Sequence, residues 1–229
     1  MSRLTELTRD VWVAPYRVAV GPLDLDSRMT VLRIGNHKLF VISPGPIDDD
    51  LKNELQSLGE VSFVVAPNLS HHLHLKNFAS AFPASRVVVP ARLKEKTSIP
   101  AEWCRLEDIE WPEGIQAFAI SGLPMLDETV FYHALSKTLV CTDLFFNFSK
   151  TGDGLPRFLA RLLGVLGRPA MSRTMRFCVR DKEAFRRSTA PLFDLQLDRI
   201  IVAHGKTVTE LPKITLFQAI SDALPMPKS

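Results

Sequence analysis

Short apolar runs rich in β-branched residues recur along the chain and alternate with segments of helical pattern. Residues 11–20 and 29–42 predict strands, and Gly35-Asn36 inside the second run predicts a hairpin turn. Further strands are expected at VSFVVAP, SRVVVPA, IQAFAIS, TVFYHAL, KTLVCTD and DRIIVAHG. Helices are expected in IDDDLKNELQSL, LHLKNFASAFP and LPKITLFQAISDAL. This interleaving, with hairpins near the start and middle, favours a layered α/β fold of the αββα type over a purely parallel sheet.

One region, from about residue 150 to residue 195, differs from the rest because it is basic and has a helical pattern. The chain has no sequence repeat, low-complexity tract or Gly/Ser linker, and its 229 residues can bury one large core. We therefore expect a single domain, residues 1–229, with a basic helical insertion at about 150–195.

The composition argues against several classes of protein. No apolar run reaches the roughly 18 residues of a membrane span, and the N-terminus lacks the apolar segment of a secretion signal. A net charge of +3 gives no general attraction to nucleic acid, and the basic segment lacks interleaved aromatic residues. The three cysteines are odd in number and widely spaced. We expect reduced thiols in a cytoplasmic protein.

Polar residues follow three of the predicted strands. His72 and His74 come after SFVVAP, Asp143 ends KTLVCTD, and His204 comes near the end of DRIIVAHG. Sites in open α/β sheets gather beyond the carboxyl ends of strands, so these residues could converge. On an extended backbone His72 and His74 would face one side, with Leu73 opposite. Imidazole and carboxylate are the usual ligands of a catalytic zinc ion, which lowers the pKa of its water to about 7.

Each of these residues also has an ordinary structural explanation. A histidine at a strand end is commonly a polar cap, and Asp143 could cap a helix that begins in LFFNF. On an extended backbone His71 points away from His72, so we expect it at the surface or behind the ligands. His133 alternates with apolar residues and is expected to form hydrogen bonds on a strand face, whereas His37 is expected to be solvated in the hairpin turn.

The order of these motifs resembles that of the metallo-β-lactamase superfamily, an αββα sandwich. HHLHLKN stands at the place of its His-x-His-x-Asp-His motif, LVCTDLFF resembles the strand with the bridging aspartate, and IIVAHG resembles the last histidine strand. The resemblance covers nearly the whole chain outside the basic segment. It implies that His72 and His74 bind a first metal, that Asp143 bridges, and that His204 binds a second metal.

The sequence departs from this family pattern at three positions. Lys76 and Asn77 replace the aspartate and histidine that should follow His74, and a protonated lysine cannot bind a metal. The segment SGLPMLDE lacks the third histidine, and Asp127 or Glu128 could substitute there. Two interpretations remain open. One is a single zinc or similar divalent ion; the other is a metal-free network that braces the sheet edge, and both use His72, His74, Asp143 and His204.

The basic segment allows three interpretations. Within LPRFLARLLGVLGR, Arg157, Arg161 and Arg168 fall near one helical face. The helix could simply pack on the sandwich with solvated arginines. It could make a weak contact with a membrane surface through residues 155–168. It could also form a lid over the site, since Gly164 and Gly167 interrupt the helical pattern.

The resemblance implies a protein of hydrolase ancestry with a depleted metal site. An active form would hydrolyse an ester, thioester, amide or phosphoester, with Asp143 orienting the attacking water. The alternatives are a non-catalytic module that binds a small anionic molecule and a peripheral membrane-associated protein.

Overall fold

Alternate residues of the strands face two different hydrophobic cores. The computed structural model describes residues 2–20, 23–93, 98, 100, 103–148 and 157–224. In strand β4 (Lys38–Ile42), Phe40 and Ile42 point into the layer between two sheets, whereas Leu39 and Val41 point toward outer helices. Because successive side chains of a strand point to opposite faces, one apolar run serves both layers.

The larger sheet has seven strands in chain order. Strands β1 (Thr5–Thr8), β2 (Val11–Val20), β3 (Leu23–Ile34) and β4 pair with one another in antiparallel order. Strands β5 (Glu60–Val65), β6 (Arg86–Val89) and β7 (Cys104–Arg105) then continue the sheet in parallel. Asn36 and His37, both with φ 57°, form the predicted turn between β3 and β4. Such left-handed pairs match the twist of a hairpin.

The smaller sheet has four strands in the order β11-β10-β9-β8. Strands β8 (Ile115–Ala119), β9 (Thr129–His133) and β10 (Thr138–Val140) are antiparallel, and β11 (Arg199–Ile201) adds in parallel to β10. The segment 103–111, between the two sheets in the chain, contains β7 and a short 3-10 turn, Leu106–Asp108.

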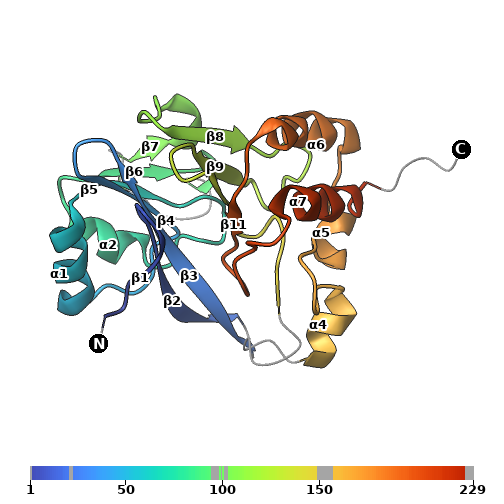
Figure 1. Ribbon diagram of the computed structural model, residues 1–229, viewed down its shortest axis with the longest axis horizontal. Helices are drawn as coiled ribbons and strands as arrows, with labels where there is room; N and C mark the ends of the chain where they lie inside the picture. The colour runs from blue at the N-terminus through green and yellow to red at the C-terminus, as the bar shows by residue number, and fades with distance from the viewer. Residues whose placement is uncertain are drawn as a thin grey trace, which may run out of the picture.

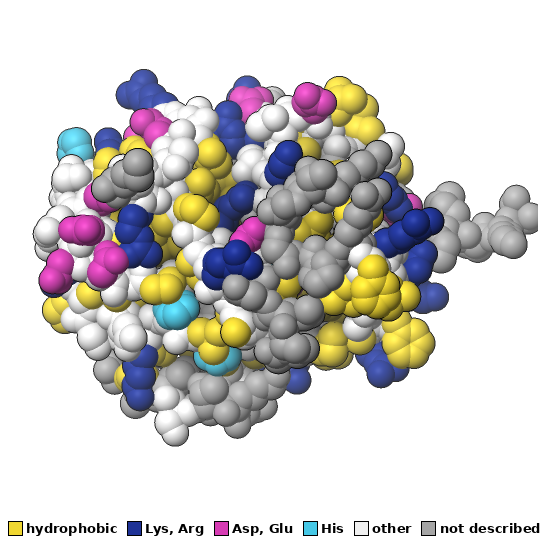
Figure 2. All heavy atoms as spheres, turned by 90° about the horizontal axis from the view of Figure 1, so that it is seen from below, with side chains coloured by type: hydrophobic (Ala, Val, Ile, Leu, Met, Phe, Trp, Pro, Cys, Tyr) yellow, Lys and Arg dark blue, Asp and Glu magenta, His cyan; other side chains and the backbone are white. Residues whose placement is uncertain are grey.

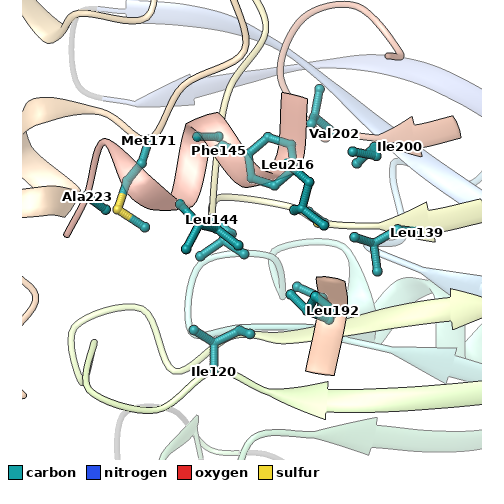
Figure 3. Packing of buried hydrophobic residues seen from close by; sticks show 14 of the residues in the cluster. Ile120, Leu139, Leu144, Phe145, Met171, Leu192, Ile200, Val202, Leu216 and Ala223 are labelled. Atoms are coloured by element: carbon teal, nitrogen blue, oxygen red, sulfur yellow. The ribbon is translucent and has the colours of Figure 1, made fainter. Parts of the chain in front are cut away.

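Helices cover the outer face of each sheet (Figure 1). Helices α1 (Asp49–Leu58) and α2 (Leu75–Ala81) pack on the larger sheet. Helix α6 (Lys182–Thr189), the 3-10 turn Ala190–Asp194 and α7 (Pro212–Ser221) pack on the smaller one. Figure 3 shows this second outer core, in which Leu139 and Ile200 of the sheet meet Leu192 and Leu216. The layers are therefore those of the predicted αββα sandwich.

The predicted basic insertion contains two further short helices. They are α4 (Arg157–Leu163) and α5 (Arg173–Phe177). In Figure 1, α5 lies below α7, and α4 lies below α5 at the same end of the molecule. Residues 150–156 of the predicted insertion lie outside the described part. Within the described residues, no helix has both the length and the apolar character needed to cross a membrane.

The layer between the sheets is centred on aromatic rings. Phe40, fully buried, lies 5.4 Å from Phe131 of the smaller sheet and 6.0 Å from Trp111, measured between ring centroids. Close aromatic pairs stabilise a core beyond the area they bury.

We expect Phe40→Ala to lower the free energy of unfolding by about 3–5 kcal/mol, because it leaves a cavity between the two sheets. Urea denaturation followed by circular dichroism measures the change. Leu135→Ala, at a side chain 74% exposed, is the control and should change stability by less than about 0.5 kcal/mol. Equal effects of the two substitutions would show that Phe40 does not hold the sheets together.

Candidate functional site

Three buried side chains meet beyond the ends of strands β5, β10 and β11. Asp143 Oδ2 lies 3.2 Å from His71 Nε2, and Asp143 Oδ1 lies 3.2 Å from His204 Nε2. One potential ligand atom from each of the three residues lies within 4.8 Å of the other two. β5 belongs to the larger sheet and the other two strands to the smaller one. The site therefore spans the edge where the two sheets come together.

An asparagine turns the chain after β5 so that His71 faces Asp143. The Asn68 side-chain oxygen accepts hydrogen bonds from the backbone N–H groups of Ser70 (2.8 Å) and His71 (3.0 Å). The Asn68 amide nitrogen donates to Asp143 Oδ2 and to the Thr142 hydroxyl, both at 3.0 Å. Asparagine commonly closes such turns, because its side chain imitates a backbone carbonyl. The segment APNLSHH thus forms a turn rather than an extended strand.

This turn changes which histidine belongs to the cluster. We expected His71 at the surface or behind the ligands, and that expectation is wrong, since His71 is buried against Asp143. His72 and His74, the predicted metal ligands, lie outside the three-residue cluster. His74 precedes helix α2 and packs edge-on against Tyr16, with ring centroids 5.6 Å apart. The strict alternation that paired His72 with His74 holds only for extended backbone.

Glu128 supports Asp143 from behind. Its carboxylate accepts hydrogen bonds from the backbone N–H groups of Thr142 (2.7 Å) and Asp143 (2.9 Å). Glu128 is 1% exposed, and burial, together with the nearby Asp143 carboxylate, raises its pKa to about 7. The SGLPMLDE segment therefore contributes a residue that fixes the loop after β10, and the sequence alone did not reveal this role.

His204 is held by its Nδ1 atom. This nitrogen lies 2.7 Å from the backbone carbonyl oxygen of Asp26, which can only accept a hydrogen bond, so Nδ1 must carry the proton. Arg28, two residues further along β3, donates to the carbonyl oxygen of Gly205 at 2.5 Å and to the Thr207 hydroxyl at 3.1 Å. Strand β3 of the larger sheet thus fixes the loop that follows β11 of the smaller one.

Gly205 allows this loop to pass close to a neighbouring strand segment. Its φ of 97° is rarely adopted by residues with a side chain, and a Cβ atom there would collide with the backbone oxygen of Asn147. The glycine after His204 is therefore required by the local backbone.

His71 is held by a serine in an unusual conformation. Ser43, directly after β4, has φ 56° and is almost fully buried. Its hydroxyl lies 2.5 Å from His71 Nδ1 and 3.3 Å from the Tyr16 hydroxyl. A non-glycine residue held at positive φ costs on the order of 1 kcal/mol or more, and such residues concentrate at functional sites.

The charges of the cluster favour an ionised Asp143. Burial alone would raise the pKa of Asp143, but the His71 charge and hydrogen bonds from His204 and His71 outweigh it and hold that pKa well below its usual range. Burial lowers the pKa of His204. The hydrogen bond to Asp143 and the charge of Asp143 raise this pKa by more than burial lowers it, so the net shift is upward. Both shifts have the same origin, a carboxylate shared between two imidazoles.

A small cavity opens beside the cluster. Its volume is about 230 Å³, and its walls include His71, Asp143 and His204. The remaining walls are mostly apolar, with two serines, and are formed by Tyr16, Val18, Leu25, Ser27, Ser70, Leu73, Phe146 and Met175. A cavity of this size suits a ligand smaller than a typical drug molecule.

The donor set fits a single divalent ion. Two imidazole nitrogens and a carboxylate match the three protein ligands of many catalytic zinc sites. One donor atom from each residue lies within 4.8 Å of the other two, which is close enough for the three to share one ion. The predicted Asp143 and His204 are therefore in place with His71 as their third partner.

His133 and His37 lie away from the His71–Asp143–His204 cluster, each in the kind of position expected from the sequence. His133 is 2% exposed and its Nδ1 lies 2.7 Å from the Ser136 hydroxyl, which confirms the expected hydrogen-bonded strand position. His37 is exposed in the hairpin turn, as expected.

The raised pKa of Glu128 predicts a pH-dependent effect on stability. Between about pH 4.5 and 7 the folded protein keeps a proton on Glu128 that the unfolded chain has lost, so rising pH reduces this contribution to stability. Glu128→Gln should therefore destabilise the protein more at about pH 5 than at about pH 8, by on the order of 2 kcal/mol. Urea denaturation of the chelator-treated protein at both pH values measures this difference. Glu110→Gln, at an exposed position, is the control, and a pH-independent effect of Glu128→Gln would contradict the prediction.

Comparison with known proteins identifies the fold. No protein-family model and no curated protein sequence matches the chain. Solved structures match along nearly the whole length. The DIM-1 metallo-beta-lactamase gives a TM-score of 0.66 at 14% identity, covering 96% of this chain and 97% of that one. A putative diflavin flavoprotein from Nostoc sp. PCC 7120 gives 0.64 at 15% identity, covering 96% and 95%.

A third solved structure extends the comparison to a form with one metal. The metallo-beta-lactamase FIM-1 from Pseudomonas aeruginosa, solved in its mono-zinc form, gives a TM-score of 0.61 at 11% identity and covers 97% of this chain and 96% of that one. These identities are low, so the likeness concerns the arrangement of the backbone. The two facing sheets, the covering helices and these structural matches together show that the protein has the metallo-β-lactamase fold.

Proposed function

We propose that His71, Asp143 and His204 bind one divalent transition-metal ion such as zinc, and that the protein is a hydrolase of small esters, thioesters or phosphoesters. The observation that carries this proposal is the 2.7 Å contact between His204 Nδ1 and the backbone carbonyl oxygen of Asp26, which selects the tautomer of His204. Because its Nδ1 donates to Asp26, a neutral His204 presents a lone pair from Nε2 to the Asp143 carboxylate at 3.2 Å. Two lone pairs at this distance repel each other unless a proton or a metal cation lies between them.

His71, like His204, has a hydrogen-bond partner at Nδ1. The Ser43 hydroxyl can accept a hydrogen bond from Nδ1, which leaves the Nε2 lone pair directed at Asp143. In metal sites the second nitrogen of a ligating histidine is commonly fixed by such a partner, which sets its tautomer and orientation. Both histidines of the cluster therefore have the outer hydrogen bond that metal ligands need.

The residues of this chain divide the proposed work among them. When bound, the ion would supply a Lewis acid and lower the pKa of an attacking water to about 7. The ionised Asp143 carboxylate would hold the ion together with the two imidazoles and would orient a water molecule by accepting a hydrogen bond. Asn68 and Glu128 keep the aspartate in position through its side chain and backbone.

The size and lining of the cavity support the proposal of a small substrate. Its apolar walls suit a short acyl or similar group, and Ser27 can contribute one polar contact. The Ser27 hydroxyl lies close enough to Tyr16 to affect the pKa of that phenol. It nevertheless makes no hydrogen bond of normal geometry within the described residues and is 2% exposed. An oxygen of a substrate would satisfy this hydroxyl, because buried polar groups without a partner are costly.

The competing proposal places a proton, rather than a metal ion, between His204 and Asp143. The raised pKa of His204 allows an imidazolium that pairs with Asp143, and the cluster would then brace the sheet edge in a non-catalytic module for a small anion. Metal binding separates the two proposals.

We expect the purified protein, equilibrated with zinc and then freed of loosely held metal, to retain one equivalent. His71→Ala and His204→Ala should each weaken binding by at least about tenfold, a loss that even outer-shell changes reach. His72→Ala and His74→Ala, in the same turn but outside the cluster, are matched controls and should retain the metal. Competition with a chromogenic chelator gives the affinities. A metal-free wild type, or equal losses in all four variants, would favour the bracing network.

We expect the zinc-loaded protein to hydrolyse short-chain p-nitrophenyl esters, or the matching thioesters or phosphodiesters, faster than long-chain ones, since the cavity is small. Asp143→Asn should reduce kcat/KM by about 100-fold or more, because it removes the charge that orients water. Initial rates with and without chelator measure both effects. Activity that survives chelation or the Asp143→Asn substitution would refute the proposed mechanism.

A further inference from the structure

Helix α4 presents its large apolar side chains to solvent. Ala160 is buried in a small cluster with Val165 and Ala170, whereas Phe158 and Leu162 are 75% and 57% exposed. Residues three and four positions apart share a helical face, so Phe158, Arg161 and Leu162 lie opposite Ala160. A helix that only covers a core shows the reverse pattern, with large apolar residues inside.

Helix α5 continues this surface. Phe177 is 79% exposed, and Arg173, one turn earlier, is also exposed. Arg173 donates a hydrogen bond to the carbonyl oxygen of Leu162 at 3.0 Å, which joins α5 to the end of α4. We call the exposed set Phe158, Arg161, Leu162, Arg173 and Phe177 the α4–α5 patch.

The charge around the patch is strongly positive. Residues 157–187 include nine lysines and arginines but only two acidic residues. Arg168 pairs with Asp222 at 2.6 Å, and Arg186 and Arg187 pair with Glu183. Arg161 and Arg173 of the patch make no ion pair with an acid anywhere in the described parts of the chain. Their charge is thus available to an external anionic surface.

We propose that the α4–α5 patch docks the protein on an anionic lipid bilayer. Exposed phenylalanine and leucine side chains among arginines are the composition of segments that lie in a membrane interface. Figure 2 views the molecule from the side on which α4 lies in Figure 1 and shows hydrophobic side chains among basic ones at this end. A second copy of the chain suits the patch less well, because two such patches would bring like charges together.

The patch is small, so docking is reversible. Three apolar side chains on two short helices enter the interface only at its surface, and the arginines supply the remaining attraction to anionic headgroups. Attraction between exposed charges is screened by salt within about 10 Å at 0.1 M ionic strength, so the binding weakens as salt is added.

Co-sedimentation of the full chain with vesicles tests this proposal. We expect binding to phosphatidylcholine vesicles that contain about 30 mol% phosphatidylserine at about 0.05 M salt, and loss of binding with pure phosphatidylcholine or at about 0.5 M salt. Arg161→Glu should weaken binding about tenfold or more, since each basic residue near the surface contributes severalfold and the change also adds a negative charge. Phe177→Ala should weaken binding severalfold through the lost apolar contact.

Two matched substitutions control for charge and apolarity. Arg9→Glu makes the same charge change at a side chain 94% exposed on the N-terminal hairpin, and Leu135→Ala removes an apolar side chain 74% exposed elsewhere. Both should bind vesicles like the wild type. Absence of binding at low salt, or equal losses in patch and control variants, would overturn the proposal. Concentration-dependent dimerisation that Phe177→Ala abolishes, without vesicle binding, would overturn it in favour of a second copy of the chain.

Discussion

The structure around the site depends on one buried carboxylate, Asp143. An isolated buried charge is very costly, so it persists only where several partners compensate it. Asp143 has such partners at both oxygens: His71 and the Asn68 amide at Oδ2, and His204 at Oδ1. Asn68 and His71 come from the loop after β5, and His204 comes from the loop after β11. Satisfying a single charge therefore fixes the mutual positions of the loops after β5, β10 and β11.

The two sheets contribute unequally to this arrangement. Strands β10 and β11 of the smaller sheet bring Asp143 and His204 to its edge, and β5 of the larger sheet leads to His71. Strand β3 then reaches across through Arg28 and the Asp26 carbonyl oxygen to fix the His204 loop. The aromatic layer around Phe40 holds the sheets at the spacing that these contacts need. Core packing and polar contacts thus both fix the position of one sheet relative to the other.

The sequence predicted the architecture better than the site. Strand alternation is a local signal, and it led correctly to two sheets with outer helices. Asp143 and His204 were identifiable because each directly follows an apolar strand. His71 was misplaced because Asn68 turns the chain by hydrogen bonds that the spacing of histidines does not reveal. Glu128 was undervalued for a related reason: its partners are backbone N–H groups of a distant loop, and such contacts leave no pattern in a single sequence.

Helix α5 serves both the interior and the exterior of the protein. Met175 forms part of the cavity wall near His204, while Arg173 and Phe177, two residues away on either side, face outward. Because α5 has only five residues, Arg173–Phe177, its inner and outer side chains lie within one and a half turns of each other. If binding at the outer surface changes the affinity of the cavity for a small molecule, that molecule must change the affinity of the outer surface by the same factor.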